Sequence, residues 1–520
     1  MMRLGQGDFH ARSAGQIRDD LIEATSVDSR NGAAWRALIG KLDAEGLSLQ
    51  AQLRRALVAA IDGGKLPAGT RLPALRVFAA HLGVSRNTVL GAVRGLEVSG
   101  HLESRARSGV YVTGAMRPGP RPRALGSAQT GWRYPPALRP SFFGLTERLP
   151  GTGEFPFPLI PGSVDADLFP TAGWRESVRA AGSVGETRRW TGDRIDEDDP
   201  ELCRQLCTTV LPARGIWAAQ EELVLTTGAQ QGLFLIAQLF LSGGRTGGIE
   251  NPGYPDLRGM LRLFTPSVVQ VPVDGQGAVP GPDLLRCDVV FLSNAVQCPT
   301  TVALAPDRQR RFLDAAARSG MVIVDDDHSV DLADPDMPPA LKAMDRTGNV
   351  IHVGSLSMML APGLRIGFVV APAEIAIELR TLRRLMMRHP PANNQRALAL
   401  FLSLGHYRAH LAHLRSAMAE RHARVAAALA AHLPEVAWQR GPASRSYWLT
   451  LPEHADGRAL AEAARRVGVL IEPGDVYFAD PADGRRHVRL SLGAIRAGRI
   501  EEAIRRLGAV LARMDHEAGL

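Results

Sequence analysis

The sequence predicts a winged helix-turn-helix followed by a large α/β domain with a mostly parallel sheet. Its 520 residues exceed what one compact domain holds. A short stretch of helical periodicity comes first, and after residue 152 apolar, strand-like runs alternate with helical segments. Between them, residues 115–152 contain seven prolines and no apolar periodicity, as expected of an extended linker.

These patterns divide the chain into four parts. We expect an N-terminal extension (1–45), a winged helix (46–114), a linker rich in Pro and Arg (115–152), and the α/β domain with a small C-terminal α/β subdomain (153–520). In the extension, four residues have the spacing of a short amphipathic helix: Trp35, Leu38, Ile39 and Leu42. The sequence leaves open whether this helix packs on the winged helix or forms a surface for a partner.

Composition excludes several classes of protein. The chain is 45% hydrophobic, but no apolar run reaches the 18 to 20 residues of a membrane span, and the N-terminus lacks the apolar core of a signal peptide. The four cysteines make neither a disulfide framework nor a zinc knuckle: Cys203, Cys207, Cys287 and Cys298. We therefore expect a cytoplasmic protein without a membrane partner.

Positive charge is concentrated near the N-terminus. The net charge is +8, yet residues 46–114 hold nine Lys and Arg against three acidic residues, and the linker holds six Arg against one Glu. The chain after residue 152 is slightly acidic. This distribution is typical of a protein whose first third binds a polyanion.

The winged helix is predicted element by element. Helices are expected over 50–61 and 73–82, and a third follows Ser85, a favourable N-cap. The third helix begins with Arg86-Asn87-Thr88, whose side chains suit phosphates and base edges. Strands over 101–104 and 110–113 enclose a basic turn and complete the wing.

The segment GGKLPAGTRLPALRVFAAHLGVSRNTVLGAVRGLEVSGHLESRARSGVYV resembles the winged helix of the GntR family over its whole length, with a departure at Leu75. This resemblance implies binding to operator DNA. It implies contacts by the following residues: Arg71, Arg76, Ser85, Arg86, Asn87, Thr88, Arg105, Arg107 and Ser108. The alternative is a winged helix that serves protein contacts only.

Apolar runs in the large domain indicate buried parallel strands at 289–292, 321–324, 350–353 and 368–370. Around them, six segments resemble fold-type I aminotransferases, and specifically the MocR-like regulators, which join a GntR-type winged helix to such a domain: PGSVDADLFP, TTGAQQGLFLIAQLF, ENPGYPDLRGM, VIVDDDHSV, GSLSMMLAPGLRIGFVVAP and HVRLSL. The resemblance spans about 155 to 515. It implies a head-to-tail homodimer and a pocket shaped for pyridoxal phosphate.

The resemblance also assigns roles within that pocket. A phosphate cup is implied for Gly228, Ala229, Gln230, Ser355, Ser357 and Arg365. Tyr254 would stack on the ring, Asp325 would hold the pyridine nitrogen, and Arg489 would grip a substrate carboxylate.

Two positions depart from the family's chemistry. Met358 occupies the place of the Schiff-base lysine, and a thioether forms no Schiff base. Asp327 stands where the family has a tyrosine beside the phenolic oxygen. The only lysine after residue 65 is Lys342, expected in an exposed segment. The sequence therefore predicts no catalytic residue, no covalent cofactor, and a regulator that senses a small, anionic effector.

Three alternatives remain. Pyridoxal phosphate could bind without a covalent bond, the chain could be an active aminotransferase, or the domain could only dimerise. A metal is not expected at residues 325–328 (Asp-Asp-Asp-His), because neighbouring side chains of a strand point in opposite directions.

Overall fold

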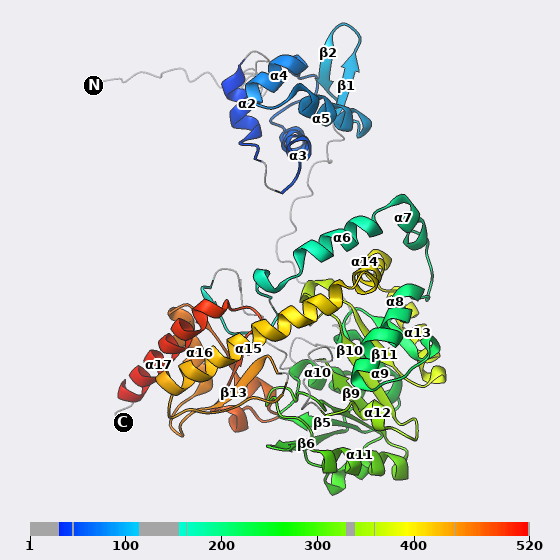
Figure 1. Ribbon diagram of the computed structural model, residues 1–520, viewed down its shortest axis with the longest axis vertical. Helices are drawn as coiled ribbons and strands as arrows, with labels where there is room; N and C mark the ends of the chain where they lie inside the picture. Colours follow the sequence, from blue (N-terminus) through cyan, green and yellow to red (C-terminus); the bar gives the residue numbers. More distant parts are fainter. Residues whose placement is uncertain are drawn as a thin grey trace, which may run out of the picture. The chain divides into compact units, whose positions relative to one another are not determined.

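The computed structural model describes residues 31–43, 46–113, 155–162, 164–328, 338–357, 359–442 and 444–517. The chain divides into two compact units, Met1–Pro135 and Pro136–Leu520 (Figure 1). The predicted linker and most of the predicted extension lie outside the described residues.

The N-terminal unit is a winged helix. Serine side chains cap two of its helices: Ser48 accepts a hydrogen bond from the Ala51 amide and Ser85 from the Thr88 amide. The second helix begins at Leu75 instead of Pro73, because Ala74 still has extended backbone angles. The elements are α3 (Leu49–Asp62), α4 (Leu75–Leu82), α5 (Arg86–Val98), β1 (Leu102–Arg105) and β2 (Gly109–Val112), with β1 and β2 antiparallel.

An additional helix, α2 (Gly32–Ile39), packs on the winged helix. Asn31 caps its start, and Trp35 is fully buried. The Trp35 ring meets Phe78 of α4 edge to face, with ring centroids 5.0 Å apart. The structure thus decides the question that the sequence left open, because α2 belongs to the hydrophobic core of the N-terminal unit.

An eight-stranded sheet forms the centre of the second unit, in the order β4-β11-β10-β9-β8-β5-β6-β7. The five strands from β10 to β6 run parallel, so their carboxyl ends meet at one edge. The strands are β4 (Leu223–Thr226), β5 (Gly247–Asn251), β6 (Val268–Asp274), β7 (Gly277–Ala278), β8 (Val289–Leu292), β9 (Val322–Asp327), β10 (Val350–Ser355) and β11 (Gly367–Val370).

One strand departs from the predicted parallel arrangement. β11 pairs antiparallel with both β10 and β4. Only eleven residues and a single 3₁₀ turn separate β10 from β11. A parallel return needs a longer crossover, so the chain turns back beside the strand it has just left.

Helices cover the sheet and lead to a smaller subdomain (Figure 1). They are α6 (Thr171–Ala181), α7 (Val184–Trp190), α8 (Pro200–Gln205), α9 (Ala229–Leu241), α10 (Pro255–Phe264), α11 (Pro306–Ser319), α12 (Leu341–Met344), α13 (Ala373–Met387), α14 (Ala392–Ser403), α15 (His406–His432), α16 (Gly457–Arg466) and α17 (Ile500–Glu517). The long helix α15 packs against α17 and leads into a second sheet. That sheet is formed by β12 (Ala437–Gln439), β13 (Ser446–Thr450), β16 (His487–Ser491) and β15 (Glu472–Pro473). Within the described part of the chain, every helix is too short or too polar to span a bilayer.

Candidate functional site

The first turn of α5 presents polar side chains to solvent. Arg86 and Asn87 are exposed. Ser85 and Thr88 are already engaged with each other, because their hydroxyl oxygens lie 2.9 Å apart and Ser85 also accepts from the Thr88 amide. Arg86 and Asn87 are therefore the side chains of this turn that remain available to a ligand.

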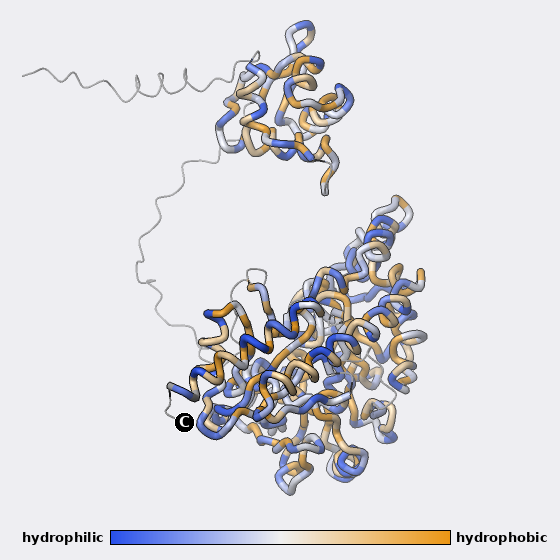
Figure 2. The backbone as a smooth tube through the Cα atoms, turned by 60° about the vertical axis from the view of Figure 1, so that its left-hand side comes forward, coloured by the Kyte–Doolittle hydropathy of each residue, from blue (hydrophilic) through white to orange (hydrophobic). Residues whose placement is uncertain are grey.

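The wing carries three of the predicted residues. The Arg105 guanidinium lies 4.5 Å from the centre of the Tyr111 ring and pairs with Glu103. The Ser108 hydroxyl is 2.7 Å from the Tyr111 hydroxyl. Arg107 is exposed at the tip with a φ of +59°, and Figure 2 shows this turn as hydrophilic at the top of the unit.

Arg71 lies beside the wing although it precedes α4. Its backbone forms a β-bridge with Tyr111 of the wing. The Arg71 guanidinium lies against Gly109, because a Cβ added to that glycine would be 3.1 Å from the Arg71 Nε. Arg76 is also exposed, on α4. The fold thus brings Arg71 to the wing and leaves Arg76 on the helix before α5.

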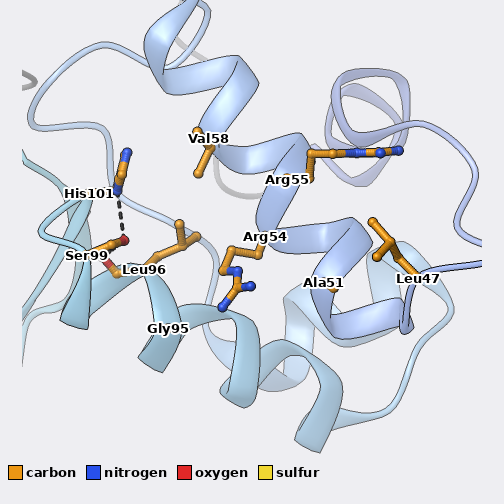
Figure 3. A pocket seen from close by; sticks show the side chains of 9 residues that line it. All are labelled: Leu47, Ala51, Arg54, Arg55, Val58, Gly95, Leu96, Ser99 and His101. Atoms are coloured by element: carbon orange, nitrogen blue, oxygen red, sulfur yellow. Dashed lines mark hydrogen bonds between the residues drawn. The ribbon is translucent and has the colours of Figure 1, made fainter. Parts of the chain in front are cut away.

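A pocket of about 450 Å³ also lies between α3 and α5 (Figure 3). Its lining is mostly apolar and includes Leu47, Ala51, Arg54, Arg55, Val58, Gly95, Leu96, Ser99 and His101. Because it adjoins the C-terminal half of α5, it is about 13 Å along the helix from the Arg86 turn.

In the large unit, some of the residues predicted for the phosphate cup meet at the start of α9. Gly228 precedes α9 with a φ of +88°, which favours glycine, and a Cβ there would come within 2.9 Å of the Arg365 guanidinium. Arg365 is exposed and donates to the Thr227 carbonyl at 2.8 Å. A helix N-terminus with an adjacent guanidinium suits an anion.

The two predicted serines of the cup differ in their contacts. Ser357 is buried, and its hydroxyl accepts from the Ile366 amide at 2.7 Å and donates to the Ile366 carbonyl at 3.2 Å. Ser355 is buried at the end of β10, opposite Gly367 of β11. The hydroxyl of Ser357 thus holds the loop in place.

Tyr254 and Gln230 meet through a carboxylate. The Tyr254 hydroxyl donates to Asp256 at 3.2 Å, and Gln230 donates to the same oxygen at 3.4 Å. Burial and the nearby Asp256 raise the pKa of Tyr254 well above its ordinary value. These contacts connect the start of α9 to the start of α10.

Asp325 and Asp327 both make buried polar contacts within the fold. Asp325 is fully buried, accepts from the Leu341 amide and lies 3.3 Å from His352 Nδ1. Asp327 forms a buried ion pair with Arg214 at 2.7 Å. Side chains alternate along a strand, so these two carboxylates share the face of β9 opposite Asp326.

Asp326, which the sequence prediction left out, lies on the opposite face of β9. It lies close enough to Tyr254, Glu250 and Cys298 to raise the pKa of each. Its Oδ1 is buried and has no hydrogen-bond partner among the described residues. Burial, followed by repulsion from Asp327 and Asp325, raises the pKa of Asp326 to about 7. Strand alternation was the signal that could have identified it.

Two further groups extend this cluster. Burial raises the pKa of Glu250 to about 8, even though Glu250 accepts from the Ser293 amide and from Gln297. Burial, followed by the nearby positive charge of Arg489, lowers the pKa of His328 to about 4. At neutral pH His328 is therefore an uncharged imidazole.

Arg489 is tied to neighbouring side chains. Its guanidinium donates to the Tyr477 hydroxyl at 3.1 Å and lies 3.6 Å from Glu472. The sequence did not predict Glu472 as a partner, although the two residues are directly opposite each other in β15 and β16. Arg489 is thus a paired residue, whereas Arg365 is exposed at its own site.

Lys342 is not exposed as predicted. Its side chain is 14% exposed, on α12, and its ammonium lies 3.6 Å from Asp345. Met358 lies outside the residues that the structure describes. Among the described residues, no cluster of His, Cys, Asp and Glu has the arrangement of a metal site.

Comparisons with known proteins agree with this two-part architecture. Residues 49–112 match the family of bacterial regulatory proteins, gntR family, and residues 196–507 match aminotransferase class I and II. The HTH-type transcriptional regulator TauR of Rhodobacter capsulatus is 38% identical over 89% of this chain and 96% of its own. The probable rhizopine catabolism regulatory protein MocR of Rhizobium meliloti is 29% identical over 79% of this chain and 80% of its own.

Solved structures support the fold of the large unit. LysN, an α-aminoadipate aminotransferase from Thermus thermophilus, superimposes with a TM-score of 0.62 at 27% identity, over 69% of this chain and 93% of its own. A kynurenine aminotransferase from Pyrococcus horikoshii gives 0.63 at 24% identity, over 69% of this chain and 91% of its own, and shows the fold alone. The chain therefore belongs to the MocR-like transcriptional regulators of the GntR family, in which a winged helix is fused to a fold-type I aminotransferase domain.

Proposed function

We propose that this regulator binds operator DNA through the start of α5 and the wing, and that its large domain binds a small, anionic effector without catalysing amino transfer. Arg86 and Asn87 are the exposed polar side chains of the α5 turn, and Arg71 and Arg107 stand at the wing. The positive charge of residues 46–114 supports the same surface.

The proposed loss of catalysis rests on the absence of the Schiff-base lysine. Met358 stands at the Schiff-base position, and Lys342 is the only lysine of the large domain. Lys342 is held by Asp345, which is itself fixed by backbone amides of the turn that follows. The residues present therefore do not fit a covalently held pyridoxal phosphate.

The anion cup supports an effector with an acidic group. Gly228, the start of α9 and Arg365 provide a cradle at which a phosphate or carboxylate gains both the helix dipole and a guanidinium. The same cradle favours one alternative, in which pyridoxal phosphate binds without a covalent bond.

We further propose that the chain works as a homodimer, head-to-tail as in the family it resembles. Several large apolar side chains of the second unit are strongly exposed: Val184, Ile377, Leu385 and Met386. Such exposure is typical of an association surface. An effector that favours one arrangement of the dimer would then shift the spacing of the two winged helices.

The test of this proposal is an absorption titration with pyridoxal phosphate, followed by dialysis. The wild-type chain and Lys342→Met are expected to show no lasting Schiff-base band and no amino transfer. A lasting band in the wild type that disappears in Lys342→Met would overturn the proposed inactivity and identify Lys342 as the attachment site.

A further inference from the structure

The N-terminal unit has a pocket away from the side chains proposed to bind DNA. It lies between α3 and the C-terminal half of α5, and its volume is about 450 Å³. Sites for small molecules in proteins have volumes of roughly 300 to 1,000 Å³ and mostly apolar walls with a few polar groups. The wall here is mostly apolar, with Ala51 and Val58 of α3 opposite Leu96 of α5 (Figure 3). The pocket therefore has the size and the lining of a site for a small organic ligand.

Arg54 supplies a positive charge to this pocket. Figure 3 shows its side chain reaching from α3 toward α5, whereas the neighbouring Arg55 extends away from α5. The Arg54 guanidinium lies against Gly95, because a Cβ added to that glycine would be 3.2 Å from the Arg54 Nη1. Arg54 is exposed and makes no ion pair or hydrogen bond with any residue that the structure describes. Its guanidinium is thus available to an anionic group.

Ser99 and His101 complete the polar part of the lining. The His101 Nδ1 lies 2.8 Å from the Ser99 hydroxyl oxygen, and the Ser99 hydroxyl donates to the Leu96 carbonyl at 3.2 Å. These two side chains are therefore held by each other and by the end of α5. Arg54 is the group of the pocket best suited to pair with a full negative charge, since a guanidinium stays protonated and presents a fork of donors.

We propose that this pocket binds a small carboxylic acid with an apolar body. Its carboxylate pairs with the fork of Arg54, and its body lies on the apolar side chains between α3 and α5. The same charge disfavours the linker as the occupant, because residues 115–152 hold six Arg against one Glu. This site goes beyond the effector binding proposed for the large domain and does not depend on it.

The test is a calorimetric titration of the full-length chain with 4-phenylbutyrate and with octanoate. The primary amides of both acids are the neutral controls. Every protein in the series carries Arg365→Gln, so that the cradle at the start of α9 has lost its guanidinium and the titration reports on the N-terminal unit. Hydrogen exchange followed by mass spectrometry locates the site, with slower exchange expected in peptides that cover residues 47–58 and 95–101.

Three variants separate charge recognition from loss of structure. Arg54→Gln is expected to weaken binding of the acids at least tenfold. Arg55→Gln is the matched control, because Arg55 is exposed on the same helix but extends away from α5, and it should bind like the parent. Ala51→Glu places a carboxylate in the pocket and should abolish binding of the acids. Its helix should remain intact, because a Glu three residues after the Ser48 cap completes a capping box. Melting temperatures show that each variant is folded.

Three results would overturn the inference. One is binding of the acids by Arg54→Gln as tightly as by Arg55→Gln. Another is equal affinity for the acids and their amides, which would leave an apolar pocket without charge recognition. The third is a full-length chain that binds neither acid; if a chain shortened to begin at residue 31 then binds them, the N-terminal extension is the occupant. None of these results concerns the effector binding or the inactivity proposed for the large domain, which are tested with pyridoxal phosphate on the wild type.

Discussion

Asp326 and Asp327 are neighbours in β9, yet only Asp327 has a cationic partner in the part of the chain that the structure describes. Its carboxylate pairs with Arg214 at 2.7 Å, and both side chains are buried. Asp326 faces the other side, where burial raises its pKa to about 7 and that of Glu250 to about 8. Burial on this face of β9 therefore favours the protonated form of both acids up to about neutral pH.

The first prediction concerns the pH dependence of stability. Between about pH 4 and pH 7 the folded chain keeps a proton on Asp326 that the unfolded chain has lost. Stability from this group is therefore present at low pH and is lost as the pH rises through 7. Asp326→Asn removes this loss, so its advantage in melting temperature over the wild type should grow from pH 4 to pH 8, by about 5 °C.

Scanning fluorimetry of both proteins across this pH range measures the effect. Asp327→Asn is the control, because it leaves Arg214 buried without its partner and should be destabilised by about 3 to 5 kcal/mol. An advantage of Asp326→Asn that shrinks as the pH rises would show that Asp326 is charged in the folded chain.

The sequence correctly predicted the caps, turns and strands that depend on neighbouring residues. The Ser85 cap, the glycine before α9 and the strand over 289–292 all follow from short-range preferences, and the structure confirms these elements. The acidic run after Val324 was expected to lie beyond its strand, but β9 continues to Asp327. Its buried carboxylates are stabilised by residues distant in sequence.

The contacts that the sequence did not predict involve partners that are distant in the chain. Arg214 is 113 residues from Asp327, and nothing around Asp327 indicates that the two meet. The pairing of Arg489 with Glu472 depends on the register of a small sheet, which periodicity does not specify. Asp326 was the exception, because the alternation of a strand already places it opposite its two neighbours.

The second prediction concerns the additional helix α2. Trp35 is fully buried against Phe78, so Trp35→Ala should destabilise the winged helix by about 3 to 5 kcal/mol and weaken DNA binding with it. Calorimetry of the full-length chain and a DNA-binding titration measure the two effects. Val77→Ala, at a side chain that is 44% exposed, is the matched control and should leave both unchanged. Equal effects of the two substitutions would exclude α2 from the core of this unit.

The third prediction separates base contacts from phosphate contacts. Using DNA that the wild type selects from a random library, Arg86→Ala should cost about 1 to 3 kcal/mol and reduce sequence preference. Arg107→Ala at the wing should weaken binding to all sequences and reduce the salt dependence by about one charge. Fluorescence anisotropy at several salt concentrations distinguishes these two patterns. If Arg86→Ala weakened all sequences equally, the start of α5 would contact only the backbone of the DNA.

The fourth prediction restores the missing lysine. Met358→Lys places a primary amine at the Schiff-base position of the family motif, so with pyridoxal phosphate it should acquire the absorption band of a Schiff base that the wild type lacks. Reduction with borohydride should then fix the cofactor to the peptide that contains residue 358, as mass spectrometry would show. Lys342→Met in the same background should leave the band unchanged, because Lys342 is held by Asp345. A Met358→Lys chain without a band would mean that the cradle of Gly228 and Arg365 does not hold pyridoxal phosphate in the family's orientation, and that the lysine was lost together with cofactor binding.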